Sequence, residues 1–192
     1  MARRVVVLVR HGQYDLDKAG EGLGGLTELG REQIARTAQR LRRFKFDAVY
    51  ASTLPRALES AKIATEILEQ PVVIGRGIAE GQRFLRSPML REGFPTKVRG
   101  YATHNIAADR ARFERAYDRF FAKPTKSSSE LLVCHGNIIR YFVCRALGIP
   151  VARWLRLGTS HAAITRIVVK DNGVVGVASF NETSHFSKKW VT

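Results

Sequence analysis

The sequence predicts an α/β fold, a three-layer α/β/α sandwich whose central sheet is mostly parallel. Residues 5–9 are five apolar residues in a row, the pattern of a strand buried on both faces. Residues 130–134 form a second, largely apolar run, and each run leads into a histidine followed by a glycine. Between the runs, apolar residues recur at helical spacing. At 192 residues, we expect a single domain spanning residues 1–192.

The other elements follow from the same two periodicities. Thr27 can cap the first helix, and Ser52 or Thr53 can cap a second helix that begins at Pro55. We expect helices marked by apolar residues within 34–44, 58–68, 113–120 and 138–147, and strands at 5–9, 47–51, 72–74, 130–134, 163–169 and 174–180, the last two joined as a hairpin.

A segment at about 81–108 has no clear periodicity. Long irregular segments inside a compact domain are usually functional loops or caps, so we expect a cap here. The segment is also rich in basic residues, which suggests a role in recruiting acidic substrates: Arg83, Arg86, Arg91, Lys97 and Arg99.

Composition limits the partners. The formal net charge of +15 favours anionic partners. The basic cluster at 36–45 lacks the interleaved aromatic residues of a nucleic-acid site, so we expect no nucleic-acid partner. The N-terminal apolar run is too short for a signal peptide, and no stretch approaches membrane-spanning length. We expect a soluble, cytoplasmic protein that contacts no membrane, with Cys134 and Cys144 as reduced thiols.

Candidate chemistry gathers where the expected strands end. Arg10 and His11 follow the first run, His135 follows the fourth expected strand, and Arg56 falls in the first turn of a helix. Open α/β sheets bind ligands outside the carboxyl ends of their strands, and helix N-termini favour anions. A guanidinium can bind phosphate oxygens in a bidentate manner, and a neutral imidazole nitrogen can attack phosphorus. The pattern therefore predicts phosphoryl transfer.

The ordered set Arg10-His11-Gly12, Ser52-x-x-x-Arg56-Ala57, Glu80 and His135-Gly136 resembles the histidine phosphatase superfamily. Further stretches, at 13–14, 26–33, 138–147, 154–157 and 164–165, are similar to its mitochondrial phosphoglycerate-mutase-like Ser/Thr protein phosphatases. The resemblance implies a phosphoglycerate mutase-like fold and a phosphomonoester hydrolase. We expect no counterpart here of the membrane anchor and regulatory N-terminal segment of those proteins, and Ala162-Ala163 stands where they have a Gly-Ser pair.

The resemblance implies roles for the matched residues. His11 would be the nucleophile, giving a phosphohistidine intermediate that water hydrolyses. Arg10, Arg56 and a protonated His135 would bind the phosphate oxygens, and His135 would also act in catalysis. The expected substrate is a Ser/Thr phosphoprotein, with a small phosphorylated metabolite as the alternative. A phosphate- or nucleic-acid-binding module without turnover is a third reading, and homodimer formation stays open.

An acid must protonate the departing alkoxide, and two glutamates compete for that role. Glu80 comes a few residues after the third expected strand, where the family places its acid, and we expect it to be catalytic. Glu92 is the rival because Leu90-Arg91-Glu92-Gly93 matches the relatives' local sequence better.

We expect no cofactor and no metal, because the arginines and His135 already supply positive charge. The remaining histidines lack partners at metal-ligand spacing, and we interpret His104, His161 and His185 as surface or hydrogen-bonded residues. Among these, His161 lies nearest to the loop that should border the pocket.

Overall fold

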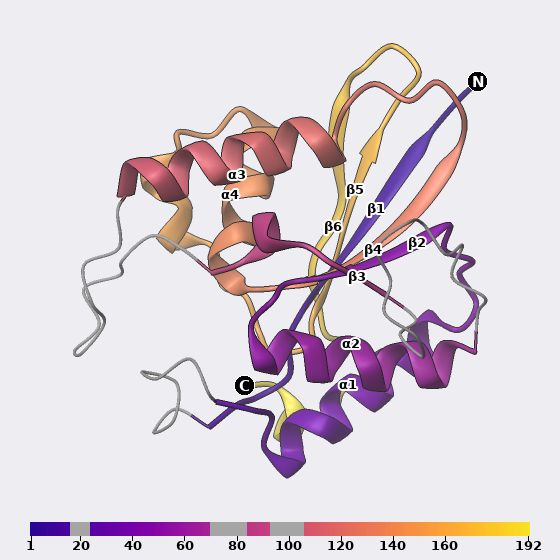
Figure 1. The fold of residues 1–192 in the computed structure, drawn as a ribbon, viewed down its shortest axis with the longest axis vertical. Helices are drawn as coiled ribbons and strands as arrows, with labels where there is room; N and C mark the ends of the chain where they lie inside the picture. Colours follow the sequence, from indigo (N-terminus) through magenta and orange to yellow (C-terminus); the bar gives the residue numbers. More distant parts are fainter. Residues whose placement is uncertain (16–23, 70–83, 93–105) are drawn as a thin grey trace.

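In the computed structural model, residues 1–15, 24–69, 84–92 and 106–192 are described (Figure 1). They form a six-stranded sheet with the order β3-β2-β4-β1-β5-β6. The strands are β1 (Arg4–Arg10), β2 (Ala48–Ala51), β3 (Leu85–Arg86), β4 (Ser128–Cys134), β5 (Ile164–Val169) and β6 (Val175–Glu182).

The sheet is mixed but mostly parallel, as the sequence predicts. β1 pairs in parallel with β4, β4 with β2, and β2 with β3. β5 runs antiparallel to β1 and forms the predicted hairpin with β6. In the β1–β4 register Arg10 lies opposite Cys134. The two residues that follow, His11 and His135, therefore leave the sheet at the same edge.

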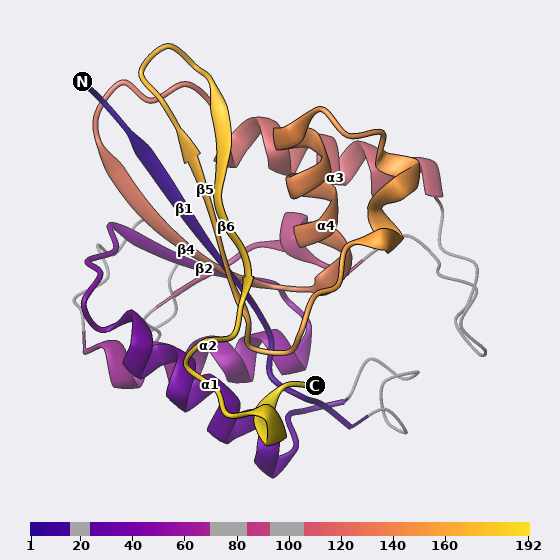
Figure 2. The same ribbon diagram turned by 180° about the vertical axis from the view of Figure 1, so that it is seen from behind.

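Helices cover both faces of the sheet (Figures 1 and 2). Along β1 the side chains alternate: Val7 and Val9 belong to the core beneath one pair of helices, and Val6 and Leu8 to the core beneath the other. Those four residues are 0–3% exposed, which explains the unbroken apolar run. One pair is α1 (Glu28–Leu41) and α2 (Pro55–Leu68), and the other is α3 (Ile106–Phe120) and α4 (Gly136–Leu147).

Short 3₁₀ helices complete the described residues: η2 (Pro88–Leu90), η3 (Val151–Arg156) and η4 (Lys188–Trp190). Part of the segment expected to be irregular is thus ordered as β3 and η2. β3 forms because residues after α2 return to the edge of β2, where the Ser87 amide donates to the Ala51 carbonyl at 2.7 Å. The strand expected at 72–74 lies outside the described residues.

The caps differ between α1 and α2. The Thr27 hydroxyl accepts from the Gly30 amide at 3.0 Å, as predicted for α1. The expected side-chain cap of α2 is wrong, because Leu54 occupies the N-cap position and no side chain caps the helix. The Ser52 hydroxyl lies instead 2.7 Å from Nε2 of His135, the residue that follows the neighbouring strand β4.

The loop after β1 packs tightly on the first turn of α1. A Cβ on Gly12 would lie 2.3 Å from the Gly30 carbonyl oxygen, and a Cβ on Gly30 would lie 2.0 Å from the Gln13 carbonyl oxygen. Glycine at both positions therefore fixes where the chain goes after His11.

Cys134 and Cys144 are buried and free, as expected. No helix within the described residues is both long enough and apolar enough to cross a bilayer.

Candidate active site

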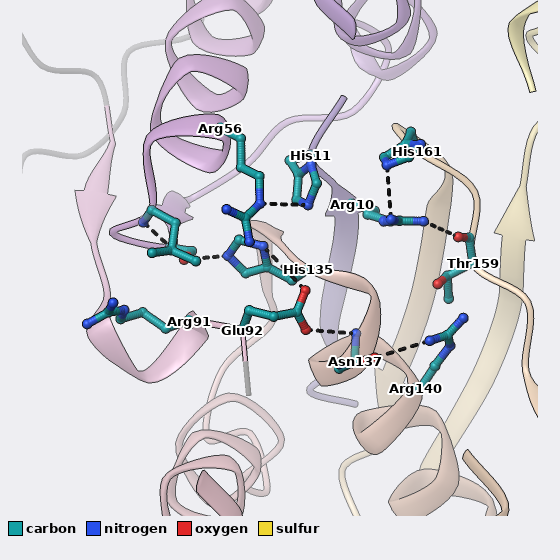
Figure 3. A network of polar contacts seen from close by, with 12 residues as sticks. Arg10, His11, Arg56, Arg91, Glu92, His135, Asn137, Arg140, Thr159 and His161 are labelled. Carbon is teal, nitrogen blue, oxygen red and sulfur yellow. Dashed lines mark hydrogen bonds and ion pairs between the residues drawn. The ribbon is translucent and has the colours of Figure 1, made fainter. Parts of the chain in front are cut away.

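Four of the predicted site residues meet at the carboxyl ends of β1 and β4, beside the N-termini of α2 and α4 (Figure 3). His11, Arg56 and His135 are buried, with exposures of 1%, 7% and 0%, while Arg10 is partly buried. The buried guanidinium of Arg56 and the partly buried one of Arg10 carry positive charge, and burial of such charge is costly unless an anion compensates for it. The site is thus built to receive negative charge.

His11 has one nitrogen fixed and the other directed into the site. Nδ1 lies 2.8 Å from the Gly12 carbonyl, which can only accept, so Nδ1 carries the proton and Nε2 keeps a lone pair. Burial, followed by the influence of His135, Arg10 and Arg56, lowers the pKa of His11 well below its ordinary value. The imidazole is therefore neutral at physiological pH, as a nucleophile requires.

Arg56 faces that lone pair. As the residue after Pro55 in α2, it projects from the first turn, and its Nε donates to His11 Nε2 at 3.2 Å. Its guanidinium carbon also lies 4.7 Å from the centre of the Tyr14 ring, which meets the His11 ring edge-on at 5.0 Å. Arg56 thus marks the place where a phosphoryl oxygen would lie next to the nucleophile.

His135 has the opposite arrangement. Its Nε2 lies 2.7 Å from the Ser52 hydroxyl, while Nδ1 is buried with no hydrogen-bond partner among the described residues. Burial, followed by Arg56 and Arg10, lowers the pKa of His135 well below its ordinary value. The expected protonated His135 is therefore corrected to a neutral ring, because burial first, and then the positive charge of Arg56 and Arg10, disfavours a proton on the imidazole.

Glu92 lies on the open side of His135. Its Oε2 is 3.8 Å from His135 Nδ1, and its Oε1 accepts from the Asn137 amide at 3.3 Å (Figure 3). Burial raises the pKa of this carboxyl, while Arg56 and Arg10 lower it. A carboxyl with a raised pKa can hold a proton near neutral pH and give it to a leaving group. Glu80 lies outside the described residues.

Arg10 is held by the loop before β5. Its Nη1 donates to the Thr159 carbonyl, and its Nη2 lies 2.9 Å from His161 Nε2. The His161 ring is 5.6 Å from the His11 ring, and burial together with Arg10 lowers the pKa of His161 to about 3. His161 therefore belongs to the site, although the sequence predicts only a surface or hydrogen-bonded residue there and its place near the pocket loop is the one signal that points to the site. Of the other two histidines, His185 bonds to Thr37 at 2.9 Å and His104 lies outside the described residues.

A hollow of about 480 Å³ opens beside this cluster. Because the hollow borders Arg10, it has room for the group to which a phosphoryl group would be esterified. The lining combines polar, aromatic and acidic side chains: Arg10, Gln13, Tyr14, Asp15, Leu26, Thr27 and His161.

His11, Glu92 and His135 offer ligand atoms within 4.8 Å of one another, which is the one group of this kind among the described residues. The arrangement fits a divalent cation poorly. Arg56 already donates to His11 Nε2. The positive charges of Arg10 and Arg56 also lie close enough to shift the pKa values of all three candidate ligands. Two guanidinium groups favour an anion over a cation in this place.

Known proteins resemble this chain in sequence. "Serine/threonine-protein phosphatase Pgam5, mitochondrial" of Drosophila persimilis is 37% identical over 196 residues, covering 94% of this chain and 63% of the relative. The corresponding protein of Homo sapiens is 32% identical over 203 residues, covering 100% of this chain and 66% of the relative. The chain thus spans less than two thirds of the length of these curated relatives.

Solved structures share the fold. Phosphoglycerate mutase from Plasmodium falciparum superposes with a TM-score of 0.66 at 28% identity, covering 98% of this chain and 96% of the other. A mycobacterial glucosyl-3-phosphoglycerate phosphatase gives a TM-score of 0.67 at 21% identity, covering 94% and 100%. At that identity the second match speaks for the fold alone. The model of the histidine phosphatase superfamily (branch 1) matches residues 6–183, and the chain belongs to this superfamily.

Proposed function

We propose that this chain hydrolyses phosphomonoesters through a phosphohistidine formed on His11. One observation carries the proposal: the unprotonated Nε2 of a buried, neutral His11 opens into a site lined by Arg10, Arg56 and His135. A site that merely bound anions would need the cations but no nucleophile with its second nitrogen fixed by the backbone.

The first step forms an Nε2–P bond and breaks the P–O bond to the leaving group. Arg56 donates to His11 Nε2. When a phosphoryl oxygen takes this donor, the lone pair becomes free for attack. Arg10, Arg56 and a neutral His135, donating from Nδ1, then stabilise the equatorial oxygens.

Glu92 acts as the acid and then as the base in this proposal. Its proton goes to the departing alkoxide, and the carboxylate afterwards takes a proton from the water that attacks phosphorus. That step breaks the Nε2–P bond and releases phosphate. The location of Glu92 beside His135 supports this role, whereas the preference for Glu80 rested on spacing after an expected strand.

A Ser/Thr phosphoprotein is the substrate class we propose. The names of the relatives at 32–37% identity support it, and the formal charge of +15 suits anionic partners. A small phosphorylated metabolite is the second candidate, because the hollow of about 480 Å³ has the size of a small-molecule site. Initial rates on phosphoserine peptides, phosphothreonine peptides and phosphorylated sugars separate the two.

The test uses para-nitrophenyl phosphate with Glu92→Gln, Glu80→Gln and the exposed control Glu28→Gln. Because nitrophenolate leaves without help, we expect Glu92→Gln to form an acid-labile, alkali-stable phosphoenzyme that breaks down about 10²-fold more slowly. His11→Asn should form none. A slow phosphoenzyme in Glu80→Gln with a normal Glu92→Gln would reverse the assignment. Phosphate binding without any turnover would instead favour a binding module.

A further inference from the structure

The guanidinium of Arg10 is held by the protein along one edge. Its two terminal nitrogens face the Thr159 carbonyl and His161 Nε2, both in the loop between η3 and β5. Its Nε, by contrast, is buried and has no hydrogen-bond partner among the described residues. A buried donor left unpaired costs free energy, so this edge is directed at something that the site is built to receive.

The position of Nε shows where that edge points. A Cβ on Gly136 would lie 3.5 Å from Arg10 Nε, so this nitrogen lies over the first residue of α4, directly after His135. Guanidinium groups bind oxyanions in a bidentate manner through Nε and one terminal nitrogen as well as through the two terminal nitrogens. With the outer pair occupied, the edge that includes Nε is the one left for a phosphoryl group.

His161 is suited to hold the outer edge. Arginine can only donate, so His161 Nε2 must accept and the ring proton must lie on Nδ1. Nδ1 lies 2.9 Å from the Thr192 hydroxyl, and the His161 amide donates to the Thr192 carbonyl at 2.8 Å. The ring is therefore anchored on one side and presents a lone pair to Arg10 on the other.

We infer that His161 is a positioning residue that turns the Arg10 guanidinium so that its Nε edge faces the phosphoryl group. This inference rests on the proposed function, since it assigns Arg10 to the bound phosphate. His161 then contributes to phosphate affinity through Arg10 and not by its own contact with the anion.

The test measures binding of inorganic phosphate by titration calorimetry, which needs no turnover. We expect His161→Leu to weaken binding about 10-fold, because it leaves one guanidinium hydrogen bond unmade. His161→Gln keeps an acceptor at a similar reach and should bind within about 3-fold of the unaltered chain. Thr65→Val, which removes a buried hydroxyl that bonds to the Ala61 carbonyl within α2, serves as the control.

A double-mutant cycle separates positioning from general damage. In an Arg10→Ala background, His161→Leu should cost no further phosphate affinity, because the residue that it positions is absent. An undiminished 10-fold loss in that background, or phosphate affinity unaffected by His161→Leu, would overturn the inference. Failure of the proposed function has a different signature: His11→Asn would keep full turnover while the calorimetric cycle is unchanged.

Discussion

The residues that follow β1 and β4 look alike in sequence, but their two histidines direct different ring nitrogens into the site. β1 and β4 lie side by side in register, and each leads into a His-Gly pair. His11 is held through Nδ1 by its own loop and opens Nε2 to the site, while His135 is held through Nε2 by Ser52 and opens Nδ1 towards Glu92. The anchoring group thus decides the role of each ring. The Gly12 carbonyl accepts from Nδ1 of His11 and so leaves a lone pair on Nε2, whereas the Ser52 hydroxyl can donate to Nε2 of His135 and so leave an N–H at Nδ1.

The largest expected effect comes from replacing each histidine by asparagine. We expect His11→Asn to lose at least about 10⁴-fold in kcat and to form no phosphoenzyme, because the attacking atom is gone. His135→Asn should lose about 10²–10³-fold, because it removes one stabilising donor, yet still form the phosphohistidine. Stopped-flow kinetics with para-nitrophenyl phosphate measure both. Equal losses of kcat, with no phosphoenzyme in either variant, would contradict the separate roles of His11 as nucleophile and His135 as donor.

A smaller effect is expected from the anchor of His135. Ser52→Ala removes the hydroxyl that fixes Nε2, so the ring can turn or change tautomer, and we expect kcat to fall about 10-fold. Ser52→Thr keeps the hydroxyl and should recover most of that loss. Thr65→Val in α2, the helix that follows Ser52, removes a buried hydroxyl that bonds to the Ala61 carbonyl at 2.9 Å and controls for lost stability. If Ser52→Ala and Thr65→Val behave alike, Ser52 has no role in orienting His135.

The smallest effect concerns stability against pH. The folded chain lowers the pKa of His11 and His135 below the ordinary 6.5, so the unfolded chain binds more protons as the pH falls below that value. Each residue therefore removes about 1.4 kcal/mol of unfolding free energy per pH unit below about 6.5, and none well above it. The raised pKa of Glu92 acts with the opposite sign, reducing stability as the pH rises above 4.5.

Urea unfolding of the unaltered chain and of the double variant His11→Asn/His135→Asn, from about pH 5 to about pH 7.5, measures this difference. The slope of unfolding free energy against pH should be shallower in the double variant below about 6.5, because two proton-excluding groups are gone. Identical slopes would mean that neither histidine is held neutral by the fold.

The fold class was predictable because it depends on local patterns. Unbroken apolar runs mark strands buried on both faces, and the observed β1 and β4 have that burial. The hairpin of β5 and β6 and the cap at Thr27 were equally local. The expected cap of α2 was not, because the Ser52 hydroxyl lies 2.7 Å from His135, 83 positions away, and caps no residue within the helix.

The sequence by itself determined the composition of the site: two histidines and two arginines placed at strand ends and at a helix start, where an anion binds. Only the tertiary structure decided which nitrogen of each ring is open, that Glu92 lies beside His135, and that His161 holds Arg10 across 151 positions of sequence. The reason is physical. Strand exits follow from local periodicity, whereas the orientation and charge of a side chain depend on partners that only folding brings into hydrogen-bond distance.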